Sequence, residues 1–108
     1  MDVRIDLTDR HKAHPDTVRD YATEKVSKLT RYFDKVQHIE IVLDEEHGQH
    51  TVEVIVTANH QLHFVGHATH DSAMACIDKV VDKLERQVVK AKERMKDHRR
   101  GESAHREP

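Results

Sequence analysis

Apolar residues in this chain recur with two different periods, and the order of those periods restricts the fold to very few architectures. A period of two is typical of a strand with one buried face, whereas spacings of three and four are typical of an amphipathic helix. Four segments follow the first pattern, at residues 3–7, 38–43, 51–56 and 62–68. Two segments follow the second, at about residues 15–33 and 72–97. The predicted order of elements is therefore β-α-β-β-β-α.

This order favours an α+β fold. The apolar face of each strand and the apolar stripe of each helix are buried together when both helices pack on one face of a four-stranded sheet and the other face stays open to water. The crossover through the first helix makes the first two strands parallel if they are neighbours, and hairpins make the later pairs antiparallel.

The length of 108 residues suits one domain, which we place at residues 1–98. The remaining residues, 99–108, form a polar tail that we expect to be flexible. Turn residues separate the last three strands at Asp44–Gly48 and at Ala58–His60. Pro15 stands where the first helix begins.

Composition excludes several classes of protein. Charged residues make up 35% of the chain, and no apolar run approaches the roughly 20 residues that cross a bilayer. The first ten residues alternate charged with apolar side chains, unlike a signal peptide. Cys76 is the only cysteine, which excludes an internal disulfide and a cysteine-rich zinc site. We expect a cytoplasmic protein with no membrane association.

The formal net charge of −2 hides an uneven distribution. Residues 36–78 hold seven acids and no Lys or Arg, whereas residues 79–100 hold nine bases and four acids. At about 100° per residue, the bases of the second helix fall on one stripe beside its apolar face. That stripe contains Lys79, Lys83, Arg86, Lys90 and Arg94, and a shorter one on the first helix contains Lys28, Arg31 and Lys35. We expect a basic helical side and an acidic open sheet face.

A basic helical surface favours binding to a polyanion, with RNA as the first candidate. Lys and Arg contacts to phosphate supply affinity without reading sequence. The chain has few aromatic residues for stacking on bases, so folded RNA fits better than a single strand. The alternative is an ordinary solvated helix surface, because Asp82 and Glu85 neighbour the stripe and can pair with it.

The histidines leave a second possibility open. On a strand, His63 and His67 share one face about 13 Å apart, too far to hold one metal ion together. Neighbouring strands offer His38, Glu40 and Glu53 as further ligands. A metal site, a pH-sensitive surface and a merely solvated face all fit this pattern.

Nothing in the sequence indicates catalysis. No base can be placed beside Cys76, Gly48 and Gly66 are isolated, and Asp44–Glu46 is typical of a solvated turn. We predict that the protein is not an enzyme and that it uses no metal or other cofactor.

Two segments resemble a known family. Residues 28–36, KLTRYFDKV, and residues 77–87, IDKVVDKLERQ, are similar to the ribosome hibernation promoting factor family. This family includes ribosome-associated inhibitor A and was once labelled sigma-54 modulation protein. The resemblance extends over about residues 1–97, and the family has the same β-α-β-β-β-α order.

The resemblance implies a bacterial cytoplasmic protein that binds the small ribosomal subunit and the 70S ribosome. Family members lodge in the channel used by mRNA and tRNA, against 16S rRNA, and block translation by occupancy under stress or in stationary phase. It implies no small-molecule substrate, and we expect a monomer when the protein is free. The implied RNA-binding residues are Lys25, Lys28, Arg31, Lys79, Lys83, Arg86 and Lys90.

Two features depart from the family pattern. Met74 stands where family members often have Tyr, which removes any stacking or hydroxyl contact from that residue. With 108 residues the sequence also resembles the short form of the family, so we expect no C-terminal dimerisation domain of the kind found in the long form.

Two alternative functions remain open beside ribosome hibernation. One is general binding of double-stranded RNA, and the other is metal binding or pH sensing by the His-rich sheet face.

Overall fold

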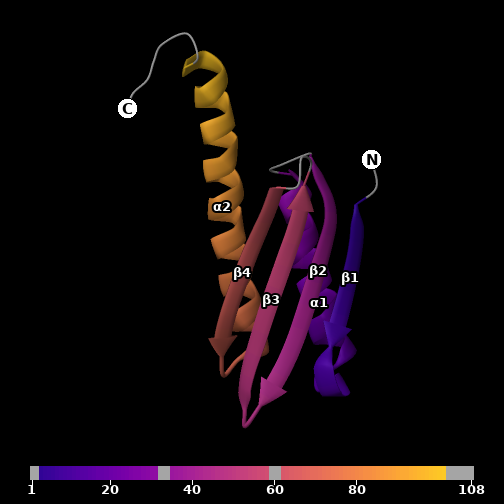
Figure 1. Ribbon diagram of the computed structural model, residues 1–108. Helices are drawn as coiled ribbons and strands as arrows, with labels where there is room; N and C mark the ends of the chain where they lie inside the picture. The colour runs from indigo at the N-terminus through magenta and orange to yellow at the C-terminus, as the bar shows by residue number, and fades with distance from the viewer. Residues whose placement is uncertain (1–2, 32–34, 59–61, 102–108) are drawn as a thin grey trace.

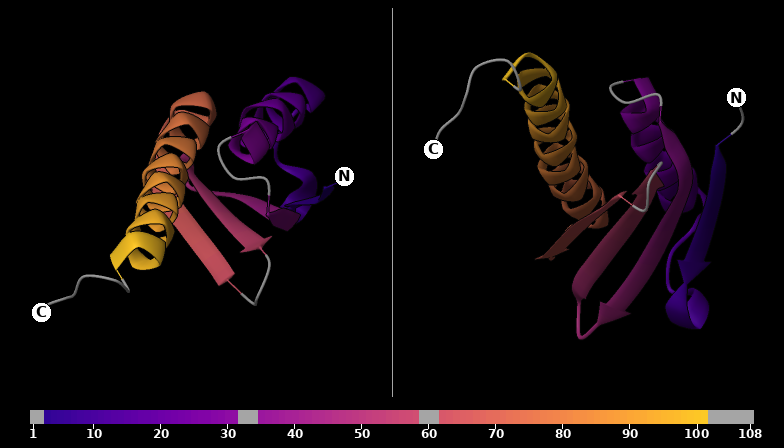
Figure 2. Two further views of the ribbon diagram at one scale, coloured as in Figure 1. Left: turned by 90° about the horizontal axis from the view of Figure 1, so that it is seen from above. Right: turned by 45° about the horizontal axis from the view of Figure 1, so that its top comes forward.

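The computed structural model describes residues 3–31, 35–58 and 62–101. One sheet contains β1 (Arg4–Asp9), β2 (Val36–Glu46), β3 (Gln49–Ala58) and β4 (Leu62–His70), in the spatial order β1-β2-β3-β4. The two long helices are α1 (Asp16–Ser27) and α2 (Ala73–Gly101), and the two short 3-10 helices are η1 (Arg10–Lys12) and η2 (Lys28–Arg31). Both long helices cover the same face of the sheet (Figures 1 and 2).

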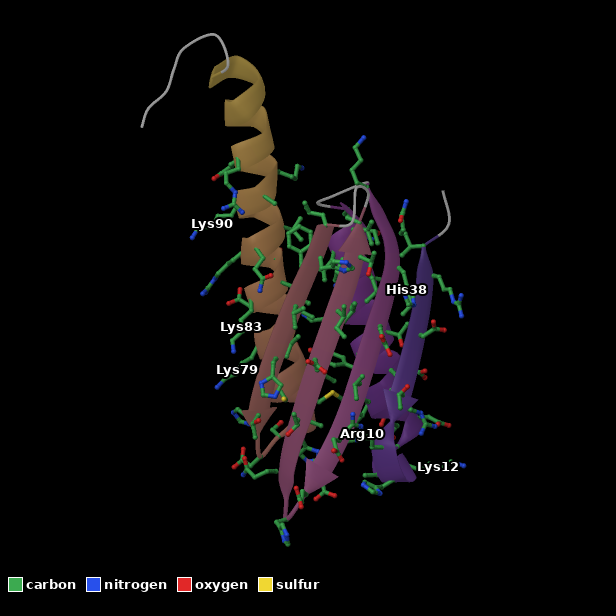
Figure 3. The ribbon with its side chains drawn as sticks, viewed as in Figure 1. Arg10, Lys12, His38, Lys79, Lys83 and Lys90 are labelled. Atoms are coloured by element: carbon green, nitrogen blue, oxygen red, sulfur yellow. The ribbon has the colours of Figure 1, made fainter. Side chains whose placement is uncertain are left out.

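The predicted fold class and connectivity are confirmed. β1 and β2 are parallel, and β2–β3 and β3–β4 are antiparallel. Side chains alternate along each strand between the core and the face that the helices leave open, here called the open face. On β2, for example, Ile39 and Ile41 are fully buried under the helices, whereas His38 lies on the open face (Figure 3).

The first predicted helix differs from the observed one in its last turns. α1 ends at Ser27 instead of continuing to residue 33, and η2 follows it. Val26 and Leu29 are both buried, so the apolar stripe continues over the sheet across this change of helix type. Residues 32–34 of the predicted helix lie outside the described residues.

The last helix and the first hairpin also extend beyond their predicted limits. α2 runs to Gly101, so the predicted tail loses residues 99–101 to the helix, and residues 102–108 lie outside the described residues. No Gly or Pro interrupts α2 before Gly101.

The turn predicted at Asp44–Gly48 is shorter in the structure, because β2 ends only at Glu46 and β3 already begins at Gln49. Only His47 and Gly48 form the turn, with φ values of 55° and 80° that match a two-residue hairpin loop.

The core lies between the sheet and the two helices. Its largest fully buried side chains come from β2, β3, both long helices and η2. They are Val26, Leu29, Ile39, Ile41, Leu43, Val52, Val54, Val56, Ile77, Val80, Leu84 and Val88. Cys76 is buried here too, with Sγ 3.1 Å from the carbonyl oxygen of Ala68. Burial raises the pKa of this thiol, so Cys76 is a packed side chain, as the sequence predicted.

Gly66 determines how closely α2 approaches β4. A Cβ atom at this position would lie 2.9 Å from Leu84 Cγ and 3.2 Å from the carbonyl oxygen of Val80. The missing side chain therefore lets the backbone of α2 lie directly over the strand.

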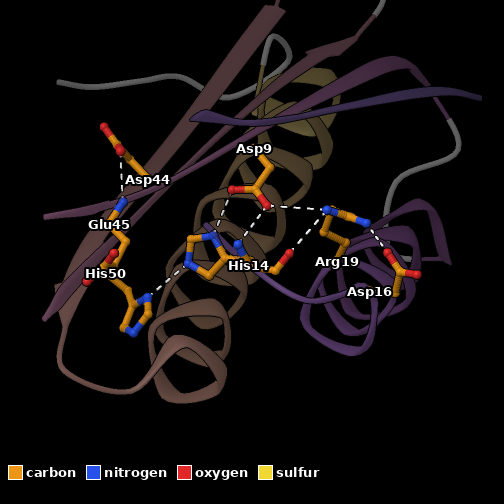
Figure 4. Close-up of polar contacts among 7 residues, drawn as sticks. All are labelled: Asp9, His14, Asp16, Arg19, Asp44, Glu45 and His50. Carbon is orange, nitrogen blue, oxygen red and sulfur yellow. Dashed lines mark hydrogen bonds and ion pairs between the residues drawn. The ribbon is translucent and has the colours of Figure 1, made fainter. Parts of the chain in front are cut away.

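A buried polar network holds the β1–α1 connection to the sheet (Figure 4). The Asp9 carboxylate accepts hydrogen bonds from the backbone N–H of His14 at 2.9 Å and from its Nδ1 at 2.8 Å. His14 Nε2 lies 2.8 Å from Nδ1 of His50 on β3. Arg19 adds a contact to Asp9 at 3.5 Å and donates to the carbonyl oxygen of His14 at 3.1 Å. The sequence predicted only a polar connection here.

The charge state of Asp9 follows from these contacts. Burial of the carboxyl acts to raise its pKa, but the hydrogen bonds from His14 outweigh it and hold the pKa below the usual 3.8. The unfolded chain therefore takes up a proton at this position at a higher pH than the folded chain does. The stability that Asp9 contributes is complete above about pH 5 and is lost as pH falls through 3.8 towards the folded-state pKa.

We predict that Asp9→Asn lowers the free energy of unfolding at pH 7 by roughly 1–3 kcal/mol, because the amide replaces a charged acceptor and leaves buried donors poorly paired. Urea unfolding measured from pH 7 down to pH 3 checks this. The gap between wild type and variant should narrow below about pH 4. Two curves that stay parallel over the whole range would contradict a depressed Asp9 pKa.

Gly66→Ala should lower the free energy of unfolding by about 1–3 kcal/mol, because the added methyl group overpacks the contact with α2. Thr69→Ala on the exposed side of the same strand is the control and should stay within about 0.5 kcal/mol of wild type. Thermal or urea unfolding of both variants measures the difference. Equal stability of the two variants would mean that α2 does not sit as closely on β4 as described.

Candidate nucleic-acid interface

One side of α2 gathers most of the predicted RNA-binding residues. The apolar stripe of α2 packs on β3 and β4, and the bases follow beside it on the side turned away from α1. We call this set, Lys79, Lys83, Arg86 and Lys90, the outer flank. All four are exposed, and Figure 3 shows Lys79, Lys83 and Lys90 on one side of α2. Over these positions the helix rises about 16 Å, so the bases form a short straight row.

Two side chains of this region are fixed against the edge of the sheet. Lys83 Nζ donates to the carbonyl oxygen of His67 at 2.7 Å, and Gln87 Nε2 donates to that of Val65 at 2.9 Å. β4 is an edge strand, so these donors satisfy carbonyls that no further strand pairs with. Gln87 was not among the predicted residues, because its role depends on which strand lies beneath α2. The hydrogen bond thereby holds the Lys83 charge at a fixed position within the outer flank.

Lys25 has a different setting from the other bases. Its Nζ lies 3.6 Å from the Asp78 carboxylate on α2 and 5.8 Å from the centre of the Tyr21 ring. The Tyr21 hydroxyl donates to the same carboxylate at 2.7 Å, and this hydrogen bond raises the Tyr21 pKa. These contacts join α1 to α2. Lys25 therefore lies between the helices, and part of its charge is matched by Asp78.

Lys28 and Arg31 form a second, smaller basic cluster at the end of α1. Both belong to η2 and both are exposed. Neither forms an ion pair with a residue in the described part of the chain. Asp78 lies between this cluster and the outer flank, and Asp82 pairs with Arg86 at 2.8 Å. The predicted bases thus occur as one row on α2, one pair after α1 and one bridging lysine.

The open face has the opposite charge. It presents acids and histidines from all four strands, and two arginines near β1 pair with acids there. Arg4 lies 3.1 Å from Asp6, and Arg10 lies 3.7 Å from Asp44. His38 Nε2 also lies 2.9 Å from Asp6, and this hydrogen bond is the main cause that lowers the pKa of that carboxyl. The molecule is therefore electrically polarised.

The structure gives the predicted histidine pattern no metal-binding geometry. His63 and His67 lie exposed on the open face, with Nδ1 of His63 3.3 Å from the Thr57 hydroxyl. Within residues 3–31, 35–58 and 62–94, no three His, Cys, Asp or Glu side chains converge on a possible metal position. Nor does that part of the chain contain a helix long and apolar enough to span a bilayer.

The sequence and fold match known proteins over most of the chain. Residues 5–96 match the family described as sigma 54 modulation protein / S30EA ribosomal protein. The ribosome hibernation promoting factor of Escherichia coli strain K12 is 32% identical over 101 residues, covering 89% of this chain and 100% of that protein. The protein of the same name from Azotobacter vinelandii is 32% identical over 87 residues, covering 81% of this chain and 80% of the relative.

Two solved structures have the same fold. The Thermus thermophilus Protein Y N-terminal domain gives a TM-score of 0.70 at 26% identity, covering 84% of this chain and 99% of that one. A ribosomal subunit interface protein from Coxiella burnetii gives 0.75 at 20% identity, covering 83% and 98%, and supports the fold alone. With the family match over residues 5–96, these findings establish that the chain belongs to the sigma 54 modulation protein / S30EA ribosomal protein family.

Proposed function

We propose that this protein binds the small ribosomal subunit and holds ribosomes in an inactive, hibernating state in the bacterial cytoplasm. The observation that carries the proposal is the row of exposed bases on the outer flank of α2, on a chain whose relatives are named ribosome hibernation promoting factor. A row of cations on a rigid helix matches the regular spacing of phosphates along folded RNA, and such contacts supply affinity without base recognition.

In this proposal the protein docks against 16S rRNA in the channel that mRNA and tRNA use. The outer flank of α2 makes the main contacts, and Lys28 and Arg31 contact a second stretch of backbone. Inhibition follows from occupancy, since a folded domain in the channel excludes the RNAs that translation needs, and no chemical step is required. The free protein is a monomer in this account.

The contacts described above suggest different roles for the predicted bases. Arg86 and Lys90 lie on the outer flank with no contact to the sheet edge, so they are available to phosphate once Arg86 leaves its exposed partner Asp82. Exposed ion pairs of this kind contribute about 0–1 kcal/mol and exchange readily for a phosphate. Lys25 instead holds α1 against α2 and affects binding through the relative position of the helices.

Reversing charge on the outer flank should remove binding. We predict that Arg86→Glu with Lys90→Glu weakens binding to 30S subunits by at least about tenfold, because two phosphate contacts become repulsive. Co-sedimentation with 30S and 70S particles in the presence of competitor double-stranded RNA measures this. Arg4→Glu with Lys12→Glu changes the net charge equally at the other side of the molecule and should bind like wild type.

The same experiment separates the rival functions. Pelleting of the wild type that survives competitor RNA supports a ribosomal site. Loss to the competitor would reduce the protein to a general binder of double-stranded RNA. Equal loss of binding in both charge-reversal pairs would contradict a role specific to the outer flank.

Affinity for 30S subunits should fall steeply with salt. If the four outer-flank bases and the pair Lys28 and Arg31 each neutralise one phosphate, the plot of log K against log salt concentration has a slope of about −5. The Arg86→Glu, Lys90→Glu variant should show a slope smaller in magnitude by about 2. Binding isotherms at several salt concentrations give both slopes, and a flat response of the wild type would exclude docking by phosphate contacts.

A further inference from the structure

The centre of the open face holds two carboxylates that have no cationic partner in the described part of the chain. Glu40 on β2 pairs in register with Ile55 on β3, and Glu53 on β3 pairs with Val42 on β2. The two acids are therefore diagonal neighbours on the same face, within about 7–8 Å of one another by sheet geometry. Neither side-chain carboxylate forms a hydrogen bond or ion pair with another of the described residues. Like charges at this separation repel and favour a cation between them.

Exposed aliphatic side chains surround these acids. Ile55 lies opposite Glu40, and Val42 lies opposite Glu53. Both aliphatic side chains are partly exposed, although they are in the middle of β3 and β2. Val65 on β4 pairs in register with Ile55 and is 49% exposed. The centre of the open face thus combines two carboxylates with three aliphatic side chains. We call these five residues the sheet patch.

Among the residues that the structure describes, no Lys or Arg forms an ion pair with Glu40 or Glu53. Arg4 and Arg10 stand near β1 and pair with Asp6 and Asp44. The lysines of α2 lie beyond the β4 edge, where Lys83 is bound to a backbone carbonyl. Among the titratable neighbours, Asp6 pairs in register with Glu40 and adds negative charge. His67 pairs in register with Glu53 and is exposed.

We propose that the sheet patch binds an extended polypeptide segment rich in Lys or Arg. Such side chains combine an aliphatic stem with a cationic head. The stems lie on Val42, Ile55 and Val65, and the heads contact Glu40 and Glu53. The segment binds through its side chains and does not add a strand, because Lys83 and Gln87 already occupy carbonyls on the β4 edge.

This inference is independent of the proposed ribosomal function. The sheet patch shares no residue with the outer flank, and the two surfaces belong to different layers of the fold (Figures 1 and 3). One molecule can therefore hold RNA on α2 and a cationic polypeptide on the sheet at the same time.

The test uses a short fluorescein-labelled peptide of alternating arginine and serine, with binding followed by fluorescence anisotropy at low salt. Glu40→Gln with Glu53→Gln should weaken binding by at least about tenfold relative to wild type, since it removes both charge contacts. Glu24→Gln with Glu85→Gln makes the same change in net charge on the helices and should bind within about twofold of wild type. Ile55→Thr keeps a β-branched side chain, removes aliphatic surface and should weaken binding several-fold.

Several results would overturn the inference. One is a wild type that does not bind the peptide, and another is equal weakening by the two Glu→Gln pairs, which would mean that binding follows net charge alone. A third is self-association of the wild type in sedimentation equilibrium that Glu40→Gln with Glu53→Gln abolishes, which would make a second copy of the chain the occupant. Binding of the Glu40→Gln, Glu53→Gln variant to 30S subunits is measured in parallel and should equal that of wild type, so failure here is distinguishable from failure of the ribosomal proposal.

Discussion

The burial of one face of the sheet under two helices is the constraint on which the rest of this structure depends. The apolar residues on the core face of β2 and β3 lose contact with water only when α1 and α2 lie across them, and the apolar stripe of each helix must then face the sheet. Once that stripe is fixed, the residues beside it are fixed as well. The bases of α2 consequently lie at the β4 side of the helix, and Gly66 allows the close approach that this requires.

The same constraint separates the charges of the molecule. Residues 36–78 carry no Lys or Arg, and they include the whole of β2, β3 and β4, so the open face is acidic wherever β1 does not contribute. The bases of α2 lie in the other layer of the fold. A protein polarised in this way is steered towards a polyanion with its helices first. The acidic face is then turned towards solvent or towards a partner of opposite charge.

The elements with strong periodicity could be predicted from the sequence, and so could their packing. Interactions between residues far apart in the chain could not. The His14–His50 contact joins residues separated by 36 positions, and nothing in the local pattern around His14 distinguishes it from the exposed His11 beside it. The different contacts of Lys25 and Lys83 could not be predicted from the sequence for the same reason. Both occur at helical spacing in basic segments. Lys25 nevertheless contacts the Asp78 carboxylate on α2, whereas Lys83 contacts the His67 carbonyl oxygen on β4.

Chemical footprinting of 16S rRNA in 30S subunits, with and without the protein, tests whether the outer flank of α2 docks in the channel used by mRNA and tRNA. If it does, backbone positions that line this channel are protected by the wild type, and the protection is lost with Arg86→Glu and Lys90→Glu. Protection confined to sites outside the channel, or unchanged by the substitutions, would contradict this docking.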